Sequence, residues 1–223
     1  MLVARGAERL EALAAELGAE PERCDVGDRA AVDALAARVA ERHPAVHLLC
    51  LNAGISGRGG GFLDLPAERI EAIAATNYLG SVWPLRAFLP LLERGAPSHV
   101  VVVASVAGTA VPLTSGPYAA SKHAQLAFAR SVSAELAPRG IRLHAVNPGP
   151  VPTPGFPQER TMRTWAGRRL VVAPERVAER IVAAVERDRA EIVVPRVLRL
   201  AAILQAAAPG LLARLAPRLR RFR

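Results

Sequence analysis

Lysine is almost missing from this sequence, and asparagine, tyrosine and cysteine are rare. Of its 29 basic residues, 28 are arginine and one is lysine. Aromatic residues make up 4% of the chain, so a core has to be built from alanine, valine and leucine. The bias is typical of an arginine- and alanine-rich genome, and each rare residue therefore calls for a specific explanation. These residues are Lys122, the asparagines Asn52, Asn77 and Asn147, and the tyrosines Tyr78 and Tyr118.

The chain has two cysteines, Cys24 and Cys50, each in a strand-like run. In the sheet order expected below they lie several strands apart, at ~4.8 Å per strand, which is beyond disulfide reach. We expect buried free thiols and, with no signal peptide visible, a reducing cytoplasm. The uncharged stretch 200–213 is too short to span a bilayer.

Acidic residues are absent after Glu191, whereas seven arginines follow it. The net charge of +9 falls to +2 without them, so the basicity belongs to a C-terminal tail. No nucleic-acid motif accompanies it, and we expect no nucleic-acid partner. Metal binding is not expected either, because the five histidines lack ligand spacing. His43 and His47 are four apart, but Pro44 breaks the helix between them.

Short apolar runs alternate with helical patterns along the chain. The expected strands are 2–4, 23–26, 46–51, 100–104, 141–146 and 191–194. The expected helices are 7–17, a segment capped by Asp28 and ended by Pro44, a long stretch 66–92 bent at Pro84, then 118–137 and 174–188. This alternation predicts an α/β fold, a doubly wound parallel sheet with helices on both faces. We expect one domain at 1–195 and a basic amphipathic tail at 196–223.

Tyr118 and Lys122 stand four residues apart on one face of an expected helix. A phenol titrates near pH ~10 unless a cation stabilises its anion, and Lys122 can supply that charge. Alone, the pair is weak evidence and favours an ordinary surface helix. Its context changes this, because Ser105 ends a buried strand 13 residues earlier, at the sheet edge where α/β folds bind ligands. The pair then becomes a plausible general acid and base for a carbonyl or alcohol oxygen.

Taken together, these motifs resemble those of the short-chain dehydrogenase/reductase family, in its order and spacing, over residues 1–195. The matched pieces are Asn-Ala-Gly at 52–54, Asn77, Ser105, Tyr118-x-x-x-Lys122 and Pro-Gly-x-Val-x-Thr at 148–153. The resemblance implies a Rossmann-like fold and an oxidoreductase that interconverts a ketone or aldehyde and an alcohol by hydride transfer. It also implies a small-molecule substrate and a homo-oligomer, a dimer or a tetramer.

The same resemblance implies the roles of single residues. Tyr118 would be the general acid and base, with its pKa lowered by Lys122, which also binds the nicotinamide ribose. Ser105 would hold the substrate oxygen, and Asn77 a water that joins Lys122 to solvent. Further implied cofactor contacts are Pro148, Gly149, Val151 and Thr153 at the nicotinamide, Asp25 and Val26 at the adenine, and Asn52, Ala53 and Gly54 at its ribose.

Arg5 bears on the choice of cofactor. NAD-dependent members of the family usually carry an acidic residue at the end of the second strand, where this sequence has Ala4-Arg5. A guanidinium matches a 2′-phosphate, so NADP(H) is favoured over NAD(H). The alternative is that Arg5 is simply one of 28 arginines.

The sequence departs from the family at its start, where Met1 aligns with the interior of the family's second strand. The first βα unit, with its glycine-rich phosphate turn, is then missing from the family's sheet order 3-2-1-4-5-6-7. The glycines at 54–61 do not match G-x-G-x-x-G and predict a flexible loop. We expect two exposed strand edges and, as the explanation, a mis-assigned start or a truncation. A non-catalytic binding or scaffold protein is the alternative function.

Two segments remain open. Residues 154–173, with Phe156, Met162 and Trp165, fall where the family places its substrate lid, and indicate either a lipophilic substrate or a packed core. In the tail 211–223, leucines and arginines gather near different faces. A helix packed on the protein or on a partner subunit is favoured there over peripheral membrane contact, because Pro217 interrupts the pattern.

Overall fold

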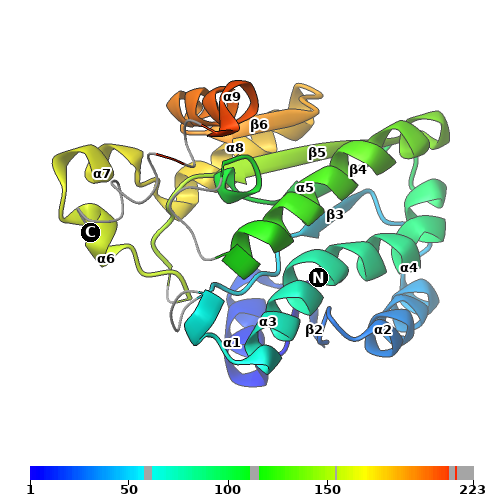
Figure 1. Cartoon of the computed structure of the whole chain (residues 1–223). Helices are drawn as coiled ribbons and strands as arrows, with labels where there is room; N and C mark the ends of the chain where they lie inside the picture. Colours follow the sequence, from blue (N-terminus) through cyan, green and yellow to red (C-terminus); the bar gives the residue numbers. More distant parts are fainter. Residues whose placement is uncertain (58–61, 111–115, 154, 211–213, 215–223) are drawn as a thin grey trace.

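The named strands form two separate sheets, and every pairing within them is parallel (Figure 1). The computed structural model of the chain describes residues 1–57, 62–110, 116–153, 155–210 and 214. One sheet pairs β1 (Leu2–Ala4) with β2 (Pro21–Arg23). The other has the order β3-β4-β5-β6, and its strands are Leu48–Leu51, Ser98–Val103, Ile141–Pro148 and Glu191–Val194.

Helices connect these strands, as the alternating pattern predicts. Those before β4 are α1 (Ala7–Leu17), α2 (Arg29–Arg42), α3 (Ala67–Ala74) and α4 (Gly80–Arg94). Those after it are α5 (Gly116–Leu136), α6 (Glu159–Met162), α7 (Trp165–Leu170), α8 (Pro174–Glu186) and α9 (Arg199–Ala207). Short 3₁₀ turns lie at Phe62–Asp64 (η1), Val106–Gly108 (η3), Ala137–Arg139 (η4) and Arg196–Leu198 (η5). The predicted α/β class is confirmed.

Two apolar clusters cover the two faces of the larger sheet, because successive side chains of a strand point to opposite faces. Val100 and Val102 of β4 belong to a cluster with residues of α2, α4 and α5. Val101 instead belongs to a cluster with Val172 and with Val177 of α8. Figure 1 shows the same arrangement, with α4 and α5 in front of the sheet and α8 behind it.

Most expected boundaries agree with the structure to within two residues, but the second strand does not. The prediction of 23–26 was wrong, since β2 ends at Arg23 and Cys24 to Val26 follow it. β2 is short and mostly exposed, so it lacks the apolar run that marks a buried strand.

The long helical stretch 66–92 changes its hydrogen bonding in an unexpected place. Pro84 lies inside the continuous helix α4, whereas a π-helical turn at Ala75–Leu79 (η2) separates α3 from α4. Asn77 occupies the middle of this turn. Turns of this kind are rare and frequently found at functional sites.

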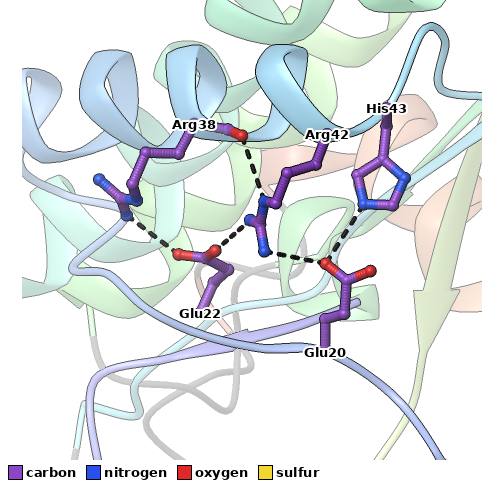
Figure 2. Close-up of polar contacts among 5 residues, drawn as sticks. All are labelled: Glu20, Glu22, Arg38, Arg42 and His43. Carbon is purple, nitrogen blue, oxygen red and sulfur yellow. Dashed lines mark hydrogen bonds and ion pairs between the residues drawn. The ribbon is translucent and has the colours of Figure 1, made fainter.

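A polar network holds β2 against α2 (Figure 2). Glu22 accepts hydrogen bonds from Arg38 at 3.0 Å and from Arg42, and Arg42 also reaches Glu20 at 3.0 Å. The side chain of Glu22 is only 12% exposed. Burial raises the pKa of this carboxyl, but the hydrogen bonds from the two arginines outweigh it, so the net pKa is lowered.

Among the strands that the structure describes, β1 and β3 each pair on one side only. Leu48 on β3 is 54% exposed, and Val3 on β1 is 40% exposed. The two cysteines are free thiols, and Cys24 is buried as expected. The prediction that Cys50 is buried was wrong, because this part of β3 lies next to an open edge. Among the described helices none is long and apolar enough to cross a membrane.

Candidate active site

The carboxyl ends of β3 and β4 and the first turns of α5 bring the predicted catalytic side chains together. Ser105 follows β4 by two residues and is 9% exposed. Its backbone is extended, and its hydroxyl caps the turn η3 by accepting from the amide of Ala107 at 3.1 Å. The cap fixes the rotamer of Ser105 and holds its hydroxyl at the sheet edge.

Tyr118 lies in the first turn of α5 and faces Ser105. The hydroxyl of Ser105 donates to the carbonyl of Pro148 at 3.5 Å, and it lies close enough to the phenol to influence its pKa. Burial raises the pKa of Tyr118, and Ser105 lowers it less than burial raises it. The prediction that Lys122 lowers this pKa was wrong, because burial of the phenol dominates. The phenol is therefore neutral at pH 7, the form that donates a proton. The ring of Phe156 lies 5.8 Å from that of Tyr118, centre to centre.

Lys122 is buried one turn further along α5, with 3% of its surface exposed. Its ammonium donates to the carbonyl of Val103 at 3.1 Å and to Oε1 of Gln125 at 2.8 Å. Burial lowers its pKa to about 7. An ammonium has three donors, so these two bonds leave one for a hydroxyl or a water.

Asn77 is fully buried and ties the loop after β3 to α5. Its Oδ1 accepts from the amide of Ile55 at 2.8 Å, and its Nδ2 donates to the carbonyl of Ile55 and to Oγ of Ser121. Both Nδ2 donors are thus used within the protein, which leaves a lone pair of Oδ1 for a water. The expected role of Asn77 in binding a water stays a prediction. Its bonds to Ile55 and Ser121 also hold the loop after β3 against α5.

Gly54 lies against the side chains of Asn77 and Lys122. A Cβ built on it would stand 3.5 Å from Oδ1 of Asn77 and 3.6 Å from Nζ of Lys122. The backbone after β3 therefore passes within van der Waals reach of both side chains. Ala53 and Asn52, one and two residues before it, are exposed.

Sequence reasoning missed two polar residues behind Lys122. Gln125 is fully buried, and its Nε2 donates to Oγ of Ser81 at 2.7 Å. Ser81 in turn donates to the backbone carbonyl of Asn77 at 3.4 Å. Gln125 stands three residues after Lys122, and this helical spacing could have suggested that the two side chains meet. Nothing in the sequence links Ser81 to Lys122 or to Gln125.

The expected adenine contacts lie together at the ends of β1 and β2. Arg5 and Asp25 form an exposed ion pair at 3.4 Å, with side-chain exposures of 57% and 44%. Oδ1 of Asp25 accepts from the amide of Gly27 at 2.9 Å. Val26 packs on the start of α4, where a Cβ on Gly80 would stand 2.7 Å from it.

The expected nicotinamide contacts lie after β5. Pro148 ends that strand, and the amide of Gly149 donates to the carbonyl of Val194 at 2.7 Å. A Cβ on Gly149 would stand 2.6 Å from the terminal methyl group of Leu198, which would have to shift to admit a larger residue. Val151 packs beside the cluster behind the sheet, and Thr153 pairs with Phe156 in a short antiparallel bridge.

The expected lid, 154–173, contains α6 and α7 and lacks a described position only at 154. Trp165 is 63% exposed and Met162 38%, which argues against a packed core at these two positions. The guanidinium of Arg169 lies 3.9 Å from the ring centre of Trp165. Of the tail helix expected at 211–223, all but residue 214 falls outside the described residues.

These residues fit the two ends of a nicotinamide dinucleotide. Gly54 and Gly149 leave the backbone bare where a flat ring or a ribose approaches, and Lys122 has a donor to spare. For the pyrophosphate, the described residues offer no glycine-rich turn at a helix N-terminus. They also contain no group of three or more potential metal ligands.

Known proteins are similar to this chain in sequence and in fold. A family model described as short chain dehydrogenase matches residues 1–164. The 1-deoxy-11-beta-hydroxypentalenate dehydrogenase of Streptomyces exfoliatus is 38% identical over 167 residues, which cover 74% of this chain and 60% of that protein. Dehydrogenase/reductase SDR family member 7B of Bos taurus is 32% identical, over 96% of this chain and 71% of that protein. The chain thus spans about 60% of the length of the Streptomyces relative.

Two solved structures extend the likeness to the fold. An alcohol dehydrogenase of the archaeon Thermococcus sibiricus, complexed with 5-hydroxy-NADP, superposes with a TM-score of 0.73 at 27% identity, over 86% of this chain and 83% of that one. A short-chain dehydrogenase from Streptomyces avermitilis superposes with a TM-score of 0.77 over 98% of this chain and 86% of that one. At 23% identity the second likeness concerns the fold alone.

Proposed function

The chain belongs to the short-chain dehydrogenase/reductase family, and on that premise we propose that it is an NADP(H)-preferring oxidoreductase acting on a ketone or a secondary alcohol. One observation carries the proposal. Ser105 lies at the end of β4, close enough to the phenol of Tyr118 to lower its pKa, and Lys122 is buried one helical turn further along α5. An acid, an oxygen-binding hydroxyl and a cation are thereby assembled around one position.

In the reduction direction Tyr118 protonates the carbonyl oxygen of the substrate. Its raised pKa keeps the phenol protonated until the substrate binds. Ser105 donates a hydrogen bond to the same oxygen, which favours the charge that develops there. The ring of Phe156 beside Tyr118 supplies an apolar wall, and this supports a lipophilic substrate.

Lys122 stabilises the phenolate that Tyr118 becomes after it gives up its proton. With a pKa of about 7, the ammonium exchanges its own proton readily near neutral pH. Val103 and Gln125 hold the ammonium in place, and Asn77 holds the loop at Gly54 against it. The bound nicotinamide supplies or accepts the hydride.

Arg5 supports the preference for NADP(H), because an exposed guanidinium at the end of β1 can pair with a 2′-phosphate. Asp25 already pairs with Arg5 at 3.4 Å, so part of that charge is compensated. The Thermococcus structure, bound to 5-hydroxy-NADP, is consistent with this preference.

Nicotinamide fluorescence titrated with NADPH and NADH tests the cofactor assignment. We expect NADPH to bind more tightly, and Arg5→Glu to weaken NADPH binding about tenfold or more while NADH binding changes little. Arg9→Glu on α1 makes the same charge change nearby and serves as the matched control. Equal effects of the two variants would contradict the role of Arg5.

Consumption of NADPH with a panel of aliphatic and aromatic ketones then tests the activity. Cofactor binding without turnover on any ketone or secondary alcohol would favour the non-catalytic alternative. Turnover that requires Ser105, lost in Ser105→Ala with unchanged NADPH affinity, supports the oxidoreductase.

A further inference from the structure

A strongly basic pocket lies along β6, the outermost strand of the larger sheet, and has no part in the proposed reaction. Its volume is about 580 Å³, and its walls come from α5, α8, β6, η5 and the start of α9. Arg130 stands twelve residues along α5 from Tyr118, or about 18 Å at 1.5 Å per residue. Six arginines line the pocket: Arg130, Arg180, Arg187, Arg189, Arg196 and Arg199.

The one acidic residue of the lining does not balance this charge. Glu191 accepts from Nε of Arg130 at 2.8 Å and from its Nη2 at 2.9 Å. It also accepts from Nδ2 of Asn147 at 3.0 Å, so the carboxylate is fully engaged inside the protein. Within the described part of the chain, the other five arginines make no ion pair with a carboxylate. The pocket therefore holds an uncompensated positive charge.

An apolar helix face continues from this pocket. Arg199 begins α9, and Leu200, Ile203 and Leu204 share one face of it by their i, i+3, i+4 spacing. These three side chains are between 55% and 61% exposed, and Val197 just before them is 55% exposed. Figure 1 shows α9 beside β6 at the outer edge of the sheet. The sequence after α9, 211–223, adds five arginines and no acid.

The charge of the pocket and the residue types on α9 indicate which kind of partner this surface binds. A second copy docked on the same face would set two uncompensated arginine clusters against each other, which costs free energy. Single-stranded nucleic acid is held by arginines with aromatic stacking platforms, whereas the exposed residues of α9 are aliphatic. Basic residues beside an exposed aliphatic helix face match a bilayer surface that carries anionic headgroups.

We propose that the β6 pocket and the apolar face of α9 form one membrane-contact surface for anionic lipid, in which the arginines bind headgroup phosphates and Leu200, Ile203 and Leu204 enter the interface. The candidate active site is then held close to a bilayer. This location would suit an enzyme whose substrates are lipophilic, although the contact itself does not depend on the proposed reaction.

Co-sedimentation of the full chain with vesicles of phosphatidylcholine, with and without phosphatidylglycerol, tests the proposal. We expect binding to the anionic vesicles, at least about tenfold weaker binding to phosphatidylcholine alone, and a similar loss in ~1 M salt, where charges are screened within ~3 Å. Arg196→Gln/Arg199→Gln and, independently, Leu200→Gln/Ile203→Gln should each lower the partition coefficient about tenfold. Arg187→Gln/Arg189→Gln removes two other arginines of the pocket and should lower the partition coefficient similarly.

The matched control is Arg29→Gln/Arg86→Gln, which removes two exposed arginines elsewhere and should bind like the wild type. Thermal unfolding by circular dichroism checks that each variant is folded. Equal partitioning of wild type and both pocket variants would overturn the proposal. So would pyrophosphate binding in the pocket without vesicle binding, or a sedimentation-equilibrium dimer that the pocket variants dissociate.

Discussion

At the scale of single residues, Lys122 is the feature that departs most from ordinary behaviour. The only lysine of the chain is nearly inaccessible, and it makes two hydrogen bonds, to the backbone of Val103 and to Gln125. Burial disfavours its charged form and lowers its pKa to about 7. The acceptor oxygens around it act in the opposite direction, because they bind only the ammonium form well.

Lys122 should therefore titrate near pH 7 rather than near 10.5. Because no other lysine is present, ¹³C-lysine labelling gives an NMR spectrum with side-chain signals from this residue alone. Gln125→Leu removes the side-chain acceptor and should lower the pKa of Lys122 further. It should also destabilise the fold by about 2 kcal/mol, since Ser81 loses its partner as well.

Gln125→Glu makes the opposite change at the same place. A carboxylate beside the ammonium should raise the pKa of Lys122 above that of the wild type. If both variants left the titration unchanged, Gln125 would have no influence on the lysine, and a structural role would be all that remained.

Sequence alone pointed to Lys122, Tyr118 and Asn77 as candidates because rare residue types fall on them in a chain otherwise rich in arginine and alanine. It pointed to Ser105 because this residue ends a buried strand. It missed the bonds behind them. Gln125 and Ser81 meet across 44 residues, and only the packing of α4 against α5 brings them together. Neither residue type is rare enough, nor the spacing regular enough, to reveal this from the sequence.

At the scale of secondary-structure elements, the contact of β2 with α2 depends on one carboxylate. Glu22 is the acceptor for Arg38 and for Arg42, and the network continues to Glu20 and His43 (Figure 2). β2 has only three residues and one neighbouring strand, so side-chain contacts weigh more for it than for β4 or β5.

Glu22→Gln should lower the free energy of unfolding by about 1 kcal/mol at pH 7, measured by urea denaturation. The folded-state pKa of Glu22 is lowered, so its stabilisation is fully present above the ordinary value of 4.5 and is lost as the pH falls through the folded value. The variant and the wild type should therefore converge in acid.

Glu11→Gln on α1 removes an exposed glutamate with no ion pair among the described residues, and serves as the control. An equal loss of stability in both variants, or a difference that persists in acid, would contradict the role given to Glu22.

Helix positions followed well from the sequence where capping and periodicity are local. Asp28 caps α2 as predicted, accepting from the amides of Ala30 and Ala31. The π-helical turn around Asn77 could not be foreseen, because prolines are the usual sequence sign of a helix irregularity and both Pro84 and Pro90 lie inside α4. β2 was misplaced because a short, exposed strand has no apolar alternation.

At the scale of the whole molecule, the described strands form two sheets that do not pair with each other, and one side of β1 and one side of β3 have no partner among the described residues. Within each sheet the strands follow the order that the family resemblance implies. The exposed strand edges expected from the resemblance are present. Cys50 lies on β3 beside this unpaired edge and is exposed, whereas Cys24, which follows β2, is only 5% exposed.

A chromogenic disulfide reagent should therefore modify one thiol rapidly in the native protein and the other only after unfolding. Cys50→Ser should abolish the fast phase, and Cys24→Ser should leave it unchanged. Burial raises the pKa of the Cys50 thiol, so its reaction should speed up with rising pH. A reaction of Cys50 that stays as slow as that of Cys24 at high pH would contradict its exposure.

The proposed reaction depends on Tyr118 as the group that moves the proton. NADPH-dependent turnover of an active ketone, measured for Tyr118→Phe and the wild type, tests this most directly, with NADPH affinity from nicotinamide fluorescence as the check on folding and binding. We predict that kcat falls about 100-fold or more, the size of a general-acid contribution, while NADPH affinity stays within about twofold. A Tyr118→Phe protein that retained full turnover would contradict the proposed function.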